Sequence, residues 1–401
     1  MKDDKKVPQL RFPEFTDAWK QRKLGEIIDY SNGIGHENYV LPQGKYELVT
    51  LKSINSSGKL VCSEKFVNED FETLKAETLI MMLSEQAKGM LGMTTIIPCD
   101  NKYVLNQRVA ALKAHNDVEV NFLTNAINNK QNYFEQMGAG TKVQNITRGH
   151  VEECVIELPS LEEQKKIGSL FSKLEVTITL QQRKLNSLQK LKKGLLQKMF
   201  PKNGENIPEI RFPEFSDAWK QRELGEIAER VTRRNSSLES QTPLTISAEY
   251  GLIDQNKFFG KRIAAKDLSN YYLIQKGEFA YNKSTSNDAP WGAIKRLDCY
   301  NNGALSTLYI VFKIKDNKSC YSDFLVTYYG TSLWHKGVKE IATEGARNHG
   351  LLNVSPSDFF RTKLVIPQDF EEQRKIGAFF TQLDNTITLQ QRWLFYTHKQ
   401  S

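Results

Sequence analysis

The sequence predicts an α+β protein in which two mixed α/β domains are joined by two long antiparallel coiled-coil helices, as an internal repeat with pseudo-twofold symmetry. Residues 8–27 return at 208–227 with 16 identities in 20, and residues 162–183 return at 371–392 with 15 identities in 22. The segments enclosed by these blocks share almost no identity. A period of roughly 200 residues is too long for a solenoid and indicates a duplicated domain-plus-helix unit.

The repeat divides the chain into five predicted parts. They are a first variable domain at 1–158 with its lead-in at 8–27, a first coiled-coil helix at 159–200, a linker at 201–207, a second variable domain at 208–366 with its lead-in at 208–227, and a second, shortened coiled-coil helix at 367–401. By the offset of 209 between the helices, Ser401 corresponds to Lys192, so Lys193–Phe200 have no counterparts in this sequence.

The two predicted helices share a heptad seam, because apolar residues recur at alternating steps of four and three. The seam residues are Ile167, Phe171, Leu174, Ile178, Gln181, Leu185, Leu188, Ile376, Phe380, Leu383, Ile387 and Gln390. We expect the helices to pair with each other in antiparallel orientation, and Gln181 and Gln390 occupy equivalent positions that could set the register. The alternative is that each helix packs on its own domain as an ordinary core helix.

The two variable segments are rich in short β-branched and aromatic runs punctuated by Gly, Asn and Pro, which is typical of strands. Their apolar runs fall in the same relative places despite the low identity. The runs at 77–82, 92–97 and 103–113 correspond to those at 278–283, 292–297 and 304–313. One mixed α/β fold carrying two divergent sets of loops is therefore predicted.

Composition bounds the class of protein. The mean hydropathy is −0.51, no apolar run approaches 18 residues, and the start MKDDKK has no apolar signal segment, so we expect a soluble, cytoplasmic protein without membrane spans. Five scattered cysteines support neither a disulfide framework nor a zinc site. The net charge of +8 is uneven, since 28–158 carries −4 and 228–366 carries +6. A basic balance fits a polyanionic partner or, equally, a solvated surface.

Recognition chemistry is expected in the loops, around 84–88 and 140–145 in the first domain and at three places in the second. Arg and Lys side chains can address guanine, Gln and Asn can address adenine, and Ser and Thr suit phosphates. Any one of these residues could instead be an ordinary solvated loop residue. The DNA-binding candidates are Gln86, Lys88, Thr141, Lys142, Gln144, Asn145, Arg233, Arg234, Asn235, Lys283, Ser284, Thr285, Asn287, Arg347, Asn348 and His349.

Motifs of catalysis are missing from the sequence. It contains no GxxxxGK[ST], HExxH or GxSxG motif and no Gly-rich dinucleotide turn. The nearest approach to an amino-methyltransferase tetrapeptide is Asp288–Trp291, which lacks the first proline of that motif. The six histidines form no ligand pair. We expect no catalytic residues, no metal and no cofactor in this chain.

The repeated blocks resemble those of the specificity subunits of type I restriction–modification systems. The resemblance rests on FPEF-x-DAW-x-QR-x-LGEI at 12–27 and 212–227, and on the LEEQ-x-KIG helix at 158–200 with its copy at 366–392. The segments 138–147 and 344–355 look like that family's final recognition loop, with Asn145 and Asn353 in matching places.

The resemblance implies that each variable domain is a target recognition domain that reads one half of a bipartite, asymmetric site in double-stranded DNA. It also implies that two methyltransferase subunits, which bind S-adenosylmethionine, dock on the helices and that restriction translocase subunits join them. Two alternatives stay open at this point. One is a coiled-coil scaffold whose domains bind proteins, and the other is a self-sufficient methyltransferase or nuclease, which the missing motifs disfavour.

Overall fold

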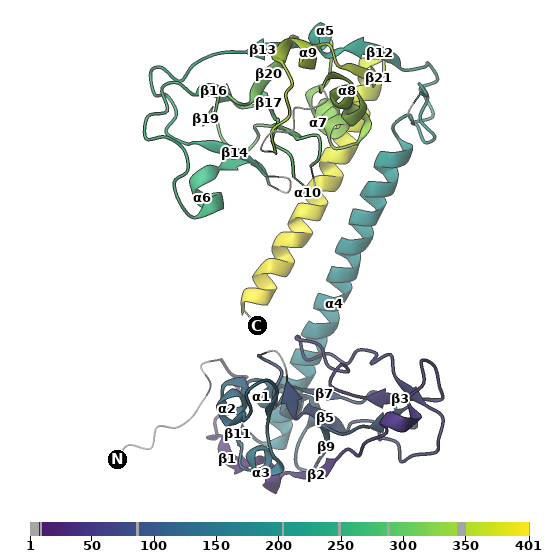
Figure 1. The fold of residues 1–401 in the computed structure, drawn as a ribbon. Coiled ribbons are helices and arrows are strands. Elements are labelled where there is room, and N and C mark those ends of the chain that lie inside the picture. The colour runs from purple at the N-terminus through teal and green to yellow at the C-terminus, as the bar shows by residue number, and fades with distance from the viewer. Residues whose placement is uncertain are drawn as a thin grey trace. The chain divides into compact units, whose positions relative to one another are not determined.

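A computed structural model describes residue 8 and residues 10–400, except 86–87, 203, 248–249, 287–288, 317 and 343–349, with side chains as far as Thr397. The chain forms two compact units, Met1–Thr179 and Leu180–Ser401. The boundary falls inside helix α4 (Leu161–Lys198), which Figure 1 shows continuing from the first unit into the second. The predicted mixture of helices and sheets with two long helices is confirmed, the second being α10 (Phe370–Gln400).

The first unit is built around a four-stranded antiparallel sheet in the order β2 (Ile28–Asn32), β9 (Val109–Ala114), β5 (Leu79–Met82) and β7 (Thr94–Ile96). Because strand side chains alternate between faces, Leu79 and Met81 join one core and Ile80 and Met82 join another. The first core includes helices α1 (Val120–Asn128) and α2 (Gln131–Met137). The second includes Val49 of β3 (Tyr46–Val49) and Tyr103 of β8 (Tyr103–Leu105). These two strands form a small sheet with β4 (Phe66–Val67), whose Val67 lies in a third cluster.

The second unit repeats this sheet with the order β13 (Ala228–Val231), β20 (Ile310–Ile314), β17 (Phe279–Asn282) and β18 (Ala293–Arg296). Phe279 and Tyr281 belong to the core that includes the helices of this unit. Ala280 belongs to a second core, with residues of β16 (Tyr272–Gln275) and β19 (Asn302–Leu305). The same fold thus carries two unrelated sequences, as predicted.

Other elements complete the two units. In the first they are η1 (Leu24–Glu26), η2 (Glu37–Tyr39), β6 (Ser84–Glu85), β10 (Gln144–Asn145) and α3 (Arg148–Glu152). In the second they are α5 (Leu224–Ile227), β14 (Leu244–Ser247), β15 (Gly251–Asp254), α6 (Gln255–Phe259), α7 (Ser322–Tyr329), α8 (Leu333–Ile341) and α9 (Pro356–Phe360).

The two repeated blocks meet each other in each unit. The lead-in forms a strand that pairs with the strand just before the long helix, β1 (Lys20–Lys23) with β11 (Val155–Leu158) and β12 (Lys220–Glu223) with β21 (Lys363–Ile366). The registers match, since Lys20 lies opposite Leu158 and Lys220 lies opposite Ile366.

A buried ion pair then fastens the lead-in to the helix. In the first unit, Arg11 donates through Nε and Nη2 to the two carboxylate oxygens of Glu163, at 2.6 and 2.7 Å. In the second, Arg211 makes the same two bonds to Glu372, also at 2.6 and 2.7 Å. Both glutamates are fully buried, so these two acidic residues hold the lead-in to the helix and do not belong to a surface charge run.

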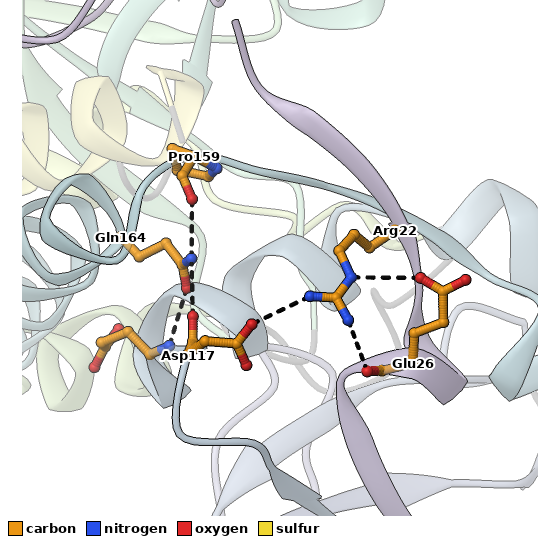
Figure 2. A network of polar contacts seen from close by, with 6 residues as sticks. Arg22, Glu26, Asp117, Pro159 and Gln164 are labelled. Carbon is orange, nitrogen blue, oxygen red and sulfur yellow. Dashed lines mark hydrogen bonds and ion pairs between the residues drawn. The ribbon is translucent and has the colours of Figure 1, made fainter. Parts of the chain in front are cut away.

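The glutamine that follows each buried glutamate orients the helix start. Gln164 accepts from the Glu119 backbone N–H at 3.0 Å and donates to the Pro159 carbonyl at 3.1 Å, and Gln373 repeats this with Tyr321 and Pro367 at 2.9 Å each. Figure 2 shows the first of these networks. The recurrence of the EEQ triplet therefore has a structural cause in both units.

The first unit extends this network through the lead-in strand (Figure 2). Arg22 bonds the Asp117 carboxylate at 3.1 Å, the Glu26 carboxylate at 3.4 Å and the Glu26 carbonyl at 2.9 Å. In the second unit Arg222 keeps the bond to Glu226, at 2.9 Å. This exposed part of the network is thus conserved between the copies only in part.

Within the second unit, the end of α4 and the helix α10 are antiparallel neighbours. Gln390 Nε2 donates to Gln181 Oε1 at 2.7 Å, Lys192 pairs with Asp384 at 2.5 Å, and the rings of Phe200 and Phe380 lie 6.3 Å apart. As the residue number of the contact rises along α4, it falls along α10, so the two helices run antiparallel. The hydrogen bond between Gln181 and Gln390 joins equivalent residues, as a local twofold relation between the helices requires.

The predicted seam residues differ in how deeply they are buried. Ile387 is buried with 8% exposure, whereas Ile376 and Phe380 pack into the domain core beside α7, as the alternative interpretation expected. Phe171 and Leu174 are 41% and 47% exposed within the first unit, and their place in a seam with α10 stays a prediction. Their equivalent Phe380 lies in a core that contains Phe200, just after α4, and Leu383 packs against that core.

Candidate nucleic-acid interface

The predicted recognition loops of the first unit form a small antiparallel ribbon. β6 pairs with β10, so that Asn145 lies opposite Ser84 and Gln144 lies opposite Glu85. Ser84 donates to Asn145 Oδ1 at 2.5 Å, and the Ile146 backbone N–H donates to the Leu83 carbonyl at 2.9 Å. Segments some 60 residues apart in the sequence are therefore brought together at one end of the unit.

Glu85 holds one side of this ribbon in place. Its side chain is 5% exposed and accepts from the backbone N–H groups of Met90 and Leu91, at 2.6 and 3.0 Å. A buried carboxylate that binds two backbone donors stabilises a loop that would otherwise leave both donors unpaired. Glu85 therefore positions the neighbouring candidates and is not itself exposed to a ligand.

Beside the ribbon lies a polar cavity of about 290 Å³, lined by Lys88, Asn132, Glu135, Gln136 and Gln144. Lys88 and Gln144 come from the two predicted loops, and the other three residues come from α2. Ammonium and amide groups supply the donors and acceptors that base edges and phosphates require. Of the remaining first-domain candidates, Thr141, Lys142 and Asn145 are exposed.

The second unit builds the same ribbon from different residues. Ser284 bridges Leu351, the Leu352 N–H donates to the Lys283 carbonyl at 2.9 Å, and the Thr285 N–H donates to the Gly350 carbonyl at 2.7 Å. The Thr285 hydroxyl also donates to Gly350 O, at 3.1 Å. Ser84 and Ser284 thus take the same position, and the matched loops come together in both units.

The ribbon corrects one predicted correspondence. Asn145 lies opposite Ser84, whereas the residue opposite Ser284 is Leu351 and not Asn353. Two further residues separate the bridge from the N-cap of the next helix in the second unit, since Thr147 caps α3 and Ser355 caps α9. Asn145 and Asn353 match only when they are counted back from the helix cap.

Arg233 and Asn235 are committed to internal contacts. Arg233 donates through Nη2 to both carboxylate oxygens of Glu278, at 2.9 and 2.8 Å. Asn235 has no exposed surface; it donates to the carbonyls of Ser240 and Leu268 at 2.8 and 3.3 Å and accepts from Ser240 N–H. The prediction that Asn235 contacts DNA is wrong, because this buried side chain already has partners in Ser240 and in the distant Leu268.

Two further cations of the second unit are partly engaged. Arg234 lies over the ring of Tyr272, 4.8 Å from its centroid, and donates to the Asn270 carbonyl at 2.5 Å. Lys283 is half-buried and donates to the Val354 carbonyl at 3.4 Å. Burial, and to a smaller degree the charge of Arg230, lowers the pKa of Lys283. Both side chains still present part of their surface to solvent.

Five candidates lie outside the described residues: Gln86, Asn287, Arg347, Asn348 and His349. Sequence reasoning missed Glu278 and Ser240, which immobilise two of the candidates. Glu278 is 45 residues from its partner Arg233, and no local signal could have found it.

Among the described side chains, no group of three His, Cys, Asp or Glu residues is placed to hold a metal ion. Burial raises the pKa of the Cys154 thiol to about 11 and that of Cys320 to about 12, so these two thiols stay protonated and unreactive at neutral pH. No helix in the described ranges has the length and hydropathy of a membrane span.

Comparison with known proteins relates the chain to proteins of DNA restriction and modification. Residues 16–190 match the type I restriction modification DNA specificity domain. The chain is 25% identical over 232 residues to the specificity subunit of the type I restriction enzyme MjaVIII from Methanocaldococcus jannaschii, and the match covers 56% of this chain but only about half, 49%, of the relative. The fold is similar to the crystal structure of a type I restriction–modification S subunit from M. genitalium, with a TM-score of 0.60 and 16% identity over 97% of this chain and 95% of that one. Residues 16–190 are therefore similar in sequence to the type I restriction modification DNA specificity domain, and the fold of the chain is similar to that of a type I restriction–modification S subunit.

Proposed function

We propose that this chain is the non-catalytic DNA specificity subunit of a type I restriction–modification complex and that each variable domain reads one half of a bipartite, asymmetric site. The observation that carries the proposal is the ribbon built twice. Ser84 and Ser284 occupy the same position in the same fold, but the residues around them differ, with Gln144 and Asn145 in one unit and Gly350 and Leu351 in the other. Equal frames with unlike surfaces suit the recognition of two unlike half-sites.

We further propose that the long helices set the spacer between the half-sites and dock two methyltransferase subunits, which carry S-adenosylmethionine and to which restriction translocase subunits are added. The target base lies within the duplex stack, so those subunits would have to extrude it before transferring a methyl group. Such a complex would act in the cytoplasm, on chromosomal DNA.

Methylation mapping in cells that carry the complete system tests this proposal. The native chain should direct methylation to one bipartite sequence. Asn145→Ala should change only the first half-site, and Thr285→Ala should change only the second. Glu371→Gln, on the exposed start of α10, is the control and should leave the sequence unchanged. A protein-binding scaffold without DNA specificity predicts that none of these variants alters the methylated sequence, and that result would contradict the proposal.

A further inference from the structure

A basic and aromatic segment of the second unit lies outside the recognition ribbon. Residues 255–266, QNKFFGKRIAAK, contain Lys257, Lys261, Arg262 and Lys266 and no acidic residue. The segment has a charge of +4, and the net charge of residues 228–366 is +6. The segment begins with α6, which Figure 1 labels below β14, away from the long helices of its unit. All four cations are exposed.

Large apolar side chains stand among these cations. Phe258, Phe259 and Ile263 are 48%, 46% and 52% exposed, and the two phenyl rings meet edge to face with centroids 4.9 Å apart. Gly260 ends α6 with φ +64°, a conformation that suits glycine and turns the chain just after the rings. Exposed aromatic rings have a cost in water, so their concentration at one turn indicates a surface that is covered by a partner.

The segment is held firmly from below. Ala264 and Leu268 are buried with Ala304, and Asn235 binds the Leu268 carbonyl. Arg262 uses its guanidinium to hold the turn, donating to the carbonyls of Ala265 and Lys266 at 2.8 and 2.9 Å. The buried Asn235 thereby gains a role, which is to anchor the base of this segment.

The three lysines are left available. Among the described residues, Lys257, Lys261 and Lys266 have no ion pair or side-chain hydrogen bond. Free ammonium groups on an anchored turn can bind phosphates, and adjacent aromatic rings can pack on bases or wedge between base steps.

We propose that this segment, called here the α6 patch (residues 255–266), is a second contact with duplex DNA that lies outside the bases read by the ribbon. The inference rests on the proposed function. Charge selects DNA over a second copy of this chain, because two copies of a +4 segment repel each other. The five-residue helix is too short to form the amphipathic face of a membrane-surface helix. The lysines bind the backbone, and Phe258 and Phe259 pack against the sugars and base edges.

The test uses the full chain in complex with its methyltransferase partner and a duplex that contains the sequence methylated in cells. The variant K257Q/K261Q/K266Q removes three charges from the α6 patch. The matched control K336Q/K339Q/K363Q removes three charges from exposed lysines of α8 and β21 in the same unit. Each phosphate contact contributes about 0.9 to the steepness with which log K falls as log salt rises. The patch variant should therefore make this slope shallower by about 3. The control variant should leave the slope unchanged.

A second variant, F258A/F259A, separates packing from charge. It should weaken binding about 10- to 100-fold at every salt concentration and leave the salt slope unchanged. Neither patch variant should change the methylated sequence, since neither touches the ribbon. Native unfolding curves for both variants would show that the unit remains folded.

Two results would overturn the inference. One is a salt slope of the patch lysine variant equal to that of the control, and the other is an unchanged affinity of F258A/F259A. Selective binding by the native complex in the same experiment would leave the proposed function intact, whereas a native complex without sequence selectivity would refute the proposed function itself.

Discussion

The buried ion pair between Arg211 and Glu372 should determine the stability of the second unit. Glu372 is fully buried and accepts from Arg211 at 2.6 and 2.7 Å and from Trp219 Nε1 at 3.3 Å. The hydrogen bond to this carboxylate raises the pKa of Arg211 above its usual value, despite the opposing effect of burial. Glu372→Gln removes the negative charge, keeps the shape and leaves a buried guanidinium without its counter-charge.

The expected cost of Glu372→Gln is about 3 kcal/mol in the free energy of unfolding, at the lower end of values for breaking a buried pair because the amide still accepts one hydrogen bond. For a unit of this size, that corresponds to a fall of about 6–12 °C in its midpoint temperature. Hydrogen exchange should report the loss locally, with faster exchange in peptides from the lead-in 208–227.

Glu371→Gln is the matched control, because Glu371 is the preceding residue and pairs with Arg374 on the exposed surface at 2.9 Å. Such a surface pair contributes little to stability, so this variant should behave as the native protein does. Glu163→Gln should reproduce the effect of Glu372→Gln, but with faster exchange in 8–27. Equal behaviour of Glu372→Gln and Glu371→Gln would refute the view that the buried pair fastens the lead-in to the helix.

Three further outcomes are expected. Inserting one heptad into each long helix adds about 10 Å and should lengthen the unmethylated spacer by about three base pairs with both half-sites unchanged; an unaltered spacer in methylation mapping would refute the ruler. Replacing residues 28–158 by the equivalent segment of a relative should alter one half-site, and a change in both would contradict separate readers. The double variant Gln181→Leu/Gln390→Leu should raise the midpoint temperature of unfolding but relax the register of α4 and α10. Spin-label distances along the helices would measure the register. A lower midpoint temperature would show instead that the glutamine pair stabilises the protein.

The repeat explains how much could be predicted. Identity between the copies located both long helices and both lead-ins, because the lead-in recurs at an offset of 200 residues and the helix block at an offset of 209. The shared layout of the apolar runs matched the loops. The residues inside the recognition loops were harder to assign. Arg233 and Asn235 look like free polar side chains in the sequence, yet Arg233 pairs with Glu278 and Asn235 binds Ser240. A side chain's partners depend on which distant segments the fold brings together.

The seam illustrates the same limit within one helix. Heptad periodicity identified Phe171 and Phe380 as equivalent apolar residues, and this equivalence is correct. Their surroundings differ, since Phe380 is 1% exposed in a core that contains Phe200, whereas Phe171 is 41% exposed. Periodicity states which face of a helix is apolar, but it does not state what covers that face.

The sequence by itself determined the duplication, the two long helices, the mixed α/β units and the places of the recognition loops, because repetition and periodicity are properties of the chain. Only the tertiary structure decided that the second glutamate of each EEQ triplet is the buried partner of a lead-in arginine, that Leu351 rather than Asn353 takes the place of Asn145, and that Asn235 anchors a basic turn. These assignments depend on hydrogen bonds and burial between residues far apart in the sequence, which no local pattern encodes.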